Sequence, residues 1–259
     1  MIIYEGPSKI DKEPIVCIMT TGSKNIKTGD MAQTWILRSD ISPVEAIKSG
    51  EDKSICGSCP QRGTSDGEHV SGRGCYVQVY QAPLSVWNAY KRGKYKKYDD
   101  EECRKILAGK TLRIGAYGDP CSISVHIWER LIRYAKSHTS YTHRWANSKV
   151  LRSRFRKFSM ASCDSELEAI KAKANGWRYF RVRKPDDPIL DNEITCPASK
   201  EAGHKTTCNQ CRLCGGADKK AKNITIMAHG SVSTISNATK NLIRVDLSKL
   251  KRKLNESTR

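Results

Sequence analysis

"TLRIGAYGDP", Thr111 to Pro120, predicts a buried strand that stops abruptly at a Gly-Asp-Pro turn. The next stretch, "SVHIWERLIRYAKSH" from Ser124 to His138, places four apolar residues on one face of a helix: Trp128, Leu131, Ile132 and Ala135. A strand followed by an amphipathic helix is the repeating unit of α/β folds, because parallel neighbours need a crossover between them. This stretch therefore predicts an α/β core.

The same alternation extends in both directions along the chain. Strands are predicted at 15–22, 34–39, 76–81, 139–145, 158–163, 177–183, 193–196 and 223–230. Helices are predicted at 42–50, 83–93 and 165–176, and the first and last of these begin with the capping boxes Ser42/Glu45 and Ser165/Glu168. The predicted fold class is α/β, a mainly parallel sheet with alternating helices and cysteine-rich metal-binding loops. A TIM-like or partial (β/α) barrel is one form that this fold can take.

The length of 259 residues suits one main core, and we expect one compact unit made of three segments. Residues 1–110 hold the first strands and helices, 111–247 the α/β core, and 248–259 a basic tail. No apolar run approaches the roughly 18 to 20 residues that span a bilayer, and the first residues lack the order of a secretory signal. We therefore expect a cytoplasmic location and no membrane partner. In a reducing compartment, the eleven cysteines are metal ligands or core thiols rather than disulfides.

Reactive side chains follow five of the predicted strands: Asp119, His143, Cys163 with Asp164, Cys196, and His229. Because the carboxyl ends of parallel strands line the ligand site of α/β folds, these residues predict one polar mouth. The alternative is that strand ends are polar simply because they meet solvent. Asp119, His143 and Asp164 are the candidate catalytic acids and bases. Asp119 can instead cap the following turn, and His143 can be a hydrogen-bonded core histidine.

The strongest metal signal is "CNQCRLCGG", Cys208 to Gly216, in which Cys208, Cys211 and Cys214 follow each other at Cys-x2-Cys spacing. Cys196, followed by Pro197, supplies a fourth thiolate. Four thiolates close either a tetrahedral zinc site or a [4Fe-4S] cluster, and the sequence does not decide between them. His204 can replace one of the thiolates.

A second set consists of Cys56 and Cys59 in "CGSCP", joined by Cys75 across a glycine-rich loop. Three thiolates leave a position that is open, as in a catalytic metal site, or completed from elsewhere, as in a structural zinc site. His69 and Cys103 are the candidates for completing it. Alternatively, the three thiolates join Cys196 at one site. Cys17, Cys121 and Cys163 stand alone in apolar contexts and are expected to be small core residues.

The formal net charge of +19 favours nucleic acid as the partner, ahead of acidic membranes or acidic proteins. The densest basic stretch, Arg144 to Lys157, contains no acid, and its basic residues are the candidate nucleic-acid contacts: Arg144, Lys149, Arg152, Arg154, Arg156 and Lys157. The alternative is a solvated basic surface. The chain has neither a Walker A loop nor a Gly-x-Gly-x-x-Gly fingerprint, which disfavours the usual nucleotide hydrolysis and Rossmann cofactor binding.

Several motifs together resemble a family of hypothetical proteins of bacteriophages and mobile elements: "CGSCPQRG", "QAPLSVWNAYKRG", "LRIGAYGDP", "YTHRW" and "CPASKEAGHKTTCNQCRLCGG". The resemblance covers most of the chain and implies expression in a bacterial host cytoplasm, but no activity. Only the architecture is similar to radical S-adenosylmethionine enzymes and tRNA-guanine transglycosylases. Neither cysteine set has the Cys-x3-Cys-x2-Cys spacing of the former.

Two hypotheses follow. The first is a phage-type cytosolic metalloprotein that binds nucleic acid and modifies or processes it at a metal-bearing α/β site. The second is a non-catalytic protein that binds nucleic acid or a host protein complex and carries purely structural zinc. The sequence leaves open whether the chain is an enzyme.

Overall fold

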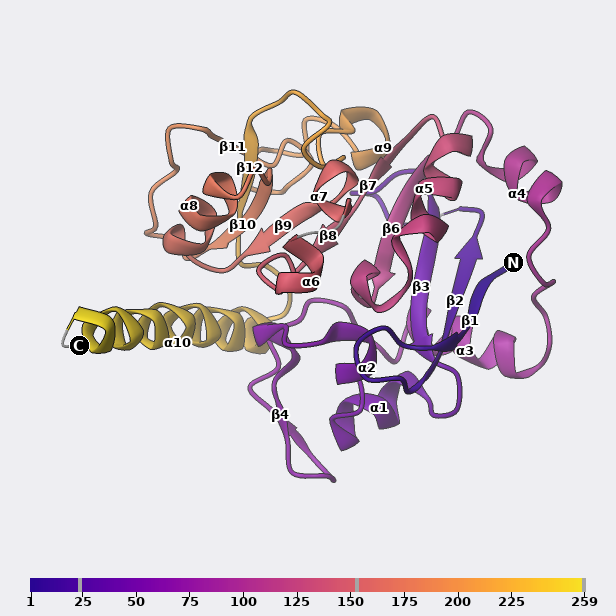
Figure 1. The fold of residues 1–259 in the computed structure, drawn as a ribbon, viewed down its shortest axis with the longest axis horizontal. Helices are drawn as coiled ribbons and strands as arrows, with labels where there is room; N and C mark the ends of the chain where they lie inside the picture. Colours follow the sequence, from indigo (N-terminus) through magenta and orange to yellow (C-terminus); the bar gives the residue numbers. More distant parts are fainter. Residues whose placement is uncertain (23–24, 152–153, 258–259) are drawn as a thin grey trace.

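A computed structural model describes the backbone of residues 1–22, 25–151 and 154–257 (Figure 1). Its side chains are described as far as Arg244, apart from those of Leu151 and the gaps. Within this part of the chain, two five-stranded sheets and their flanking helices form the body, and a two-stranded hairpin is added to it.

The first sheet is mixed. Its strand order is β1 (Ile2–Pro7), β2 (Pro14–Thr20), β3 (Ala32–Arg38), β6 (Thr111–Tyr117) and β7 (Ser137–Thr139). The first three strands pair antiparallel, whereas β3, β6 and β7 pair parallel. Strands β2 and β3 are almost entirely buried and form the centre of the main hydrophobic core, with Leu112 of β6 and Trp128 of α5 (Val125–Tyr134).

The second sheet is wholly parallel. Its order is β11 (Glu193–Thr195), β12 (Asn223–Met227), β10 (Tyr179–Arg183), β9 (Met160–Cys163) and β8 (Tyr141–Thr142). Only Ser140 separates β7 from β8, so the chain passes directly from one sheet to the other. The predicted α/β class is confirmed, with the antiparallel β1–β3 making the first sheet mixed.

Most remaining elements are short. They are α1 (Pro43–Ser49), α2 (Lys53–Cys56), η1 (Pro60–Arg62), β4 (Thr64–Ser65), β5 (Val70–Ser71), α3 (Ala82–Lys91), α4 (Asp100–Leu107), η2 (Pro120–Ser122), α6 (Ser148–Leu151), α7 (Phe155–Phe158), α8 (Glu166–Ala174), α9 (Cys208–Cys211) and α10 (Val232–Ser257). Figure 1 shows the last of these, drawn in yellow, running outward from the body. None of the helices in the described residues has the length and apolarity that crossing a membrane requires.

A smaller hydrophobic cluster lies on the second sheet and contains two of the predicted metal ligands. Cys196 and Cys214 are buried there beside Met160, Ile224 and Ile226. The cysteine-rich loop is therefore packed against β9 and β12 as part of the core. Its two buried thiols are fixed by the sheet rather than held on a surface loop.

The predicted strand at 76–81 is wrong. These residues form an irregular connection before α3, with Tyr76 and Tyr80 exposed. An alternating pattern produces a strand only where a neighbour pairs with it, and within the described residues 76–81 pair with no strand of either sheet. Strand β1 and helices α4 and α10 were not predicted, and the backbone of the basic tail at 248–257 continues α10 as helix.

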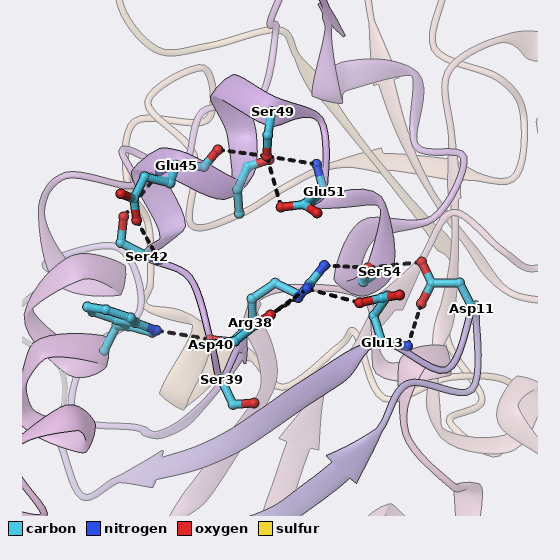
Figure 2. A network of polar contacts seen from close by, with 12 residues as sticks. Asp11, Glu13, Arg38, Ser39, Asp40, Ser42, Glu45, Ser49, Glu51 and Ser54 are labelled. Carbon is cyan, nitrogen blue, oxygen red and sulfur yellow. Dashed lines mark hydrogen bonds and ion pairs between the residues drawn. The ribbon is translucent and has the colours of Figure 1, made fainter. Parts of the chain in front are cut away.

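Arg38, at the end of β3, fixes the chain that leads to Cys56. Its buried guanidinium donates to both oxygens of Asp40, to Glu13, and to the Ser54 hydroxyl at 3.3 Å. Ser54 donates in turn to Asp11, so one cation holds three separate segments (Figure 2). Because Ser54 lies in α2, two residues before Cys56, this network sets the position of the first cysteine loop.

Candidate functional site

One cavity of about 370 Å³ lies where the strands of both sheets end. Its wall contains residues of β6, β7, β8, β9, β10 and β12 and of the loops that follow them. A residue at each of the five predicted strand ends lines it: Asp119, His143, Asp164, Cys196 and His229. Cys163 is buried behind the wall and is not part of the lining. The structure thus brings these strand ends to one mouth.

Both predicted cysteine sets line this same cavity. From the amino-terminal half come Cys56, Cys59 and Cys75, and from the carboxy-terminal half Cys196, Cys208, Cys211 and Cys214. All eleven cysteines of the chain are free thiols. Two thiol-rich loops that are far apart in sequence therefore face one shared space.

Within each set the thiols are near enough to influence one another. Burial raises the pKa of Cys56 far above its ordinary value, and negative charge at Asp52, Cys59 and Cys75 adds to the effect. Burial likewise raises the pKa of Cys214 to about 12, with contributions from Cys196, Cys208 and Cys211. Within the residues that the structure describes, however, no three His, Cys, Asp or Glu side chains converge closely enough to hold a single metal ion.

His143 lies between the amino-terminal thiols and Asp164. Its Nε2 lies 3.1 Å from Oδ2 of Asp164, so these two buried atoms form an ion pair when His143 is protonated. Burial lowers the pKa of His143, but the neighbouring charges of Cys59 and Asp164 outweigh it and raise that pKa well above its usual value. The structure therefore places an imidazole that favours its charged form between Cys59 and the carboxylate of Asp164.

A buried polar chain connects Asp164 to the last helix. The side-chain amide of Gln61, in η1, donates to Oδ1 of Asp164 at 3.1 Å. The side-chain amide of Asn241, in α10, donates to the side-chain oxygen Oε1 of Gln61 at 3.3 Å. Asn241 also donates to the backbone of Gly72, and Asn237 to that of Arg73, in the loop before Cys75. The start of α10 thus braces both Asp164 and the first cysteine loop.

Asp119 has its oxygens fully occupied. It accepts hydrogen bonds from the Thr142 hydroxyl, from the backbone of Cys121 and from the backbone of His143. Burial raises the pKa of Asp119, although these donors favour its charged form. Asp119 caps η2 and ties the end of β8 to the turn after β6. It therefore has the capping role that the sequence offered as the alternative, and it also positions His143.

The second cysteine loop is held from several sides. The backbone N–H groups of Cys208 and Asn209 donate to the carbonyls of Lys27 and Thr28, and a capping box between Thr207 and Gln210 starts α9. The Arg178 guanidinium donates to the carbonyls of Leu213 and Gly216. This loop is therefore docked onto the chain between β2 and β3 as well as onto the second sheet.

The alternative donors suggested by the sequence lie elsewhere. His69 is exposed next to Asp66 in the β4–β5 hairpin, Cys103 is buried under α4, and His204 is exposed with its Nδ1 3.1 Å from the Ala198 carbonyl oxygen. None of the three lines the cavity. Sequence reasoning treated His143 only as an acid or base. The sequence contains no local signal that His143 lies near Cys59, because this proximity depends on β8 ending beside η1 in the folded chain.

The predicted basic residues do not line the cavity. Lys149, Arg156 and Lys157 are exposed, whereas Arg154 pairs with Glu129 at 2.8 Å. Arg144 is half-buried against Gly57, and Arg152 lies outside the described residues. Any nucleic-acid surface made by this stretch is therefore separate from the cavity wall.

Comparison with known proteins adds no relative to this picture: no family model, no curated protein and no solved structure matches the chain. What the site does must therefore be argued from its own geometry.

Proposed function

We propose that the chain is a metalloenzyme that binds nucleic acid and modifies or processes it in the shared cavity. The observation that carries this proposal is that seven cysteines, His143 and Asp164 line one cavity near the carboxyl ends of parallel strands. A purely structural metal needs no cavity, whereas a catalytic one needs an open position that a substrate can reach.

Cys196, Cys208, Cys211 and Cys214 form the closed centre, since four thiolates complete a tetrahedral site or a cluster. Cys56, Cys59 and Cys75 form the second centre, with His143 beside them. Nε2 of His143 and Oδ2 of Asp164 are ion-paired there, whereas the buried hydroxyl of Tyr117 has no hydrogen-bond partner and points to a ligand. Leaving such a hydroxyl unpaired is unfavourable in a buried site, and a bound metal with its ligands relieves this.

We favour iron–sulfur clusters over zinc. The thiols of each set influence one another's pKa, yet in the described residues no three donors converge on one ion position. Thiolates that hold a four-iron cluster surround a larger object than those that hold one zinc ion, so a cluster does not require the donors to converge on one ion position. When bound, the cluster at Cys56, Cys59 and Cys75 supplies redox chemistry at the cavity, and His143 and Asp164 hold and move protons next to it.

We further propose that the two sheets act as one partial barrel around this centre. The passage from β7 to β8 across Ser140, and a cavity lined by strands of both sheets, support this arrangement. The net charge of +19 and the exposed Lys149, Arg156 and Lys157 support a nucleic-acid partner. Free thiols throughout and the phage-type motifs support a bacterial host cytoplasm as the setting.

One observation favours a second candidate function. The exposed basic residues lie outside the cavity, so binding of nucleic acid or of a host protein complex does not need a reaction there. In that case the protein is a binding module, and both thiol sets hold structural zinc.

Anaerobic purification followed by elemental analysis and absorption spectroscopy tests the proposal. We expect iron and sulfide, a broad band near 400 nm (roughly, for iron–sulfur clusters), and loss of about half of the iron in Cys59→Ala and in Cys211→Ala separately. Cys17→Ala, a buried core thiol outside the cavity, is the control and should retain all of the metal. Colourless protein with stoichiometric zinc supports the binding module, and metal-free folded protein contradicts the metal centres of both candidates.

A further inference from the structure

We propose that the mouth of the cavity contains a nucleotide subsite, in which Tyr76 stacks on a base while Lys27, Arg113 and Arg212 bind phosphate. This inference rests on the proposed function and names the part of the cavity that would hold one unit of a single strand. All four side chains line the cavity. The basic stretch at 144–157, from which a nucleic-acid contact was predicted, supplies none of them.

Tyr76 is an aromatic platform that is fixed but still accessible. Its ring stacks on that of His229, with centroids 5.1 Å apart and planes inclined by 30°, yet 49% of its surface remains exposed. Its hydroxyl accepts a hydrogen bond from Nη2 of Arg113 at 3.2 Å. A ring held in place on one face and at its hydroxyl loses little conformational freedom when a base stacks on it, which is favourable for binding.

His229 is suited to this role because it is neutral. Burial lowers the pKa of His229, the positive charge of Lys27 lowers it further, and a hydrogen bond to the Met227 carbonyl opposes them in part. His229 therefore extends the platform as an uncharged ring. The positive charge at this mouth then comes from Lys27, Arg113 and Arg212.

The three cations are not neutralised by carboxylates. In the part of the chain that the structure describes, Lys27, Arg113 and Arg212 form no ion pair with Asp or Glu. The carboxylates of the same wall are engaged elsewhere: Asp119 with Thr142, and Asp164 with Gln61 beside His143. An anionic group entering this mouth therefore meets unpaired positive charge.

The position of Lys27 links the platform to the second thiol set. Its charge acts on His229 and also on Cys196 and Cys208. Tyr76 directly follows Cys75 of the first thiol set. A nucleotide seated on Tyr76 would thus lie between the two proposed metal centres, in a cavity whose volume is within the range of small-ligand sites.

An exposed aromatic ring flanked by cations is the pattern that single-stranded nucleic-acid sites share, because every base has a face that can stack and every unit carries a phosphate. Phosphate alone would explain the cations but not the platform. An aromatic ligand without an anion would leave the three positive charges unused. A nucleotide uses both features.

The test measures binding of hexanucleotides, one of DNA and one of RNA, each carrying 2-aminopurine at a central position, to metal-loaded protein. Tyr76→Ala should weaken binding by about tenfold and abolish the quenching of the stacked base. Arg113→Gln should lower the slope of log K against log salt by about 0.7, the value for one phosphate contact on a single strand. Tyr80→Ala and Arg133→Gln change an exposed tyrosine and an exposed arginine outside the cavity and should bind as the unaltered protein does.

The outcomes separate this inference from the proposed function. Affinity for one hexanucleotide only supports the subsite and identifies which nucleic acid it accepts. If Tyr76→Ala and Arg113→Gln keep full affinity, full quenching and their metal, the subsite is wrong while nucleic-acid binding stands. Metal-loaded protein that binds neither strand overturns the subsite and the nucleic-acid part of the function together. Protein without metal that still binds through Tyr76 overturns only the metal part.

Discussion

At the scale of single residues, Gly118 shows why the stretch "GAYG" at the end of β6 has to end in glycine. Its φ is +84°, and an added Cβ would lie 2.7 Å from Cβ of Ile36 and 2.9 Å from the Ile36 carbonyl oxygen. The neighbouring strand β3 thus lies directly against this backbone. Any side chain here must push β3 away from the strand end that carries Asp119.

Gly118→Ala is therefore expected to destabilise the fold by more than the left-handed backbone alone explains. Gly109→Ala is the matched control, because Gly109 has a φ of +74° with nothing within 4 Å of its added Cβ. We expect about 1 to 2 kcal/mol for the control and about 1 to 3 kcal/mol more for Gly118→Ala, measured by urea unfolding. Equal losses of stability in the two variants would show that β3 shifts to accommodate the added methyl group at no additional cost in free energy.

His138 gives a residue-level dependence on pH. Its Nε2 lies 3.0 Å from the Phe158 carbonyl oxygen, and burial lowers the pKa of this histidine despite hydrogen bonds that favour its charged form. As the pH falls, His138 becomes protonated in the unfolded chain below about pH 6.5, before it does so in the folded chain. The stability that neutral His138 provides is thus complete above that pH and is lost as the pH falls towards the lower folded-state pKa.

We expect the free energy of unfolding to fall less between pH 7.5 and 5.5 in His138→Gln than in the unaltered protein, because glutamine can donate to Phe158 without titrating. Urea unfolding at both pH values measures this. His126→Gln, at an exposed site on α5, is the control and should keep the full pH dependence. A His138→Gln protein with an unchanged pH dependence would assign that dependence to other groups.

Local sequence rules identified what single residues do to their own neighbours along the chain. The capping box at Ser42 and Glu45 is present in full. The one at Ser165 is half present: its hydroxyl accepts from Glu168, but the Glu168 carboxylate accepts from Asp164 instead. The contact between His143 and Cys59 could not be found in this way, because no rule of spacing relates a strand end to a distant cysteine loop.

At the scale of elements, Asp119 joins two strand ends. It receives its donors from η2 and from the end of β8, so its removal leaves the Thr142 hydroxyl and the backbone N–H groups of Cys121 and His143 without acceptors. Each unsatisfied buried donor costs about 1 to 3 kcal/mol. We therefore expect Asp119→Ala to lower the free energy of unfolding by roughly 2 to 4 kcal/mol.

This expectation separates a positioning role from chemistry. Thr142→Val removes one of the donors and should cost less than Asp119→Ala, by the same urea measurement. Because Asp119 orients the backbone of His143, Asp119→Ala should also change the absorption spectrum of the metal-loaded protein. If the variant keeps full stability and an unchanged spectrum yet loses all turnover, Asp119 acts on the substrate directly.

Elements with local signals were predictable, and those that depend on pairing were not. From β6 onward every predicted strand exists, because each is a short apolar run with a local signal of its own. Residues 76–81 carry a strand pattern but pair with no strand in the described structure. Strand β1 was missed for the opposite reason: Gly6 and Pro7 disfavour a strand, yet β2 is available to pair with it.

At the scale of the whole molecule, the sequence supplied the ligands but not their arrangement. Cys-x2-Cys spacing identified both thiol sets, since that signal is local. That both sets face one cavity depends on β6 to β10 and β12 meeting at its wall, together with α10 bracing Gln61. Tertiary packing of this kind produces no periodic pattern in the sequence.

The last helix allows the charge of the molecule to be separated from its site. The described contacts of α10 with the first cysteine loop come from Asn237 and Asn241 near its start, and Figure 1 shows the rest of the helix running away from the sheets. Residues 248–259 carry five basic residues and one acid: Lys249, Lys251, Arg252, Lys253 and Arg259 against Glu256. Deleting them should therefore remove positive charge without disturbing the cavity.

We expect the protein without residues 248–259 to keep its melting temperature and metal content but to bind a single-stranded oligonucleotide more weakly at low salt. Each lost phosphate contact should lower the slope of log K against log salt by about 0.7. A full-length variant with Lys249, Lys251, Arg252 and Lys253 changed to glutamine should behave alike, because the effect comes from charge and not from helix length. If both proteins keep the original slope, the charge that attracts nucleic acid lies on the body, and the mouth at Tyr76 and Arg113 becomes the main contact.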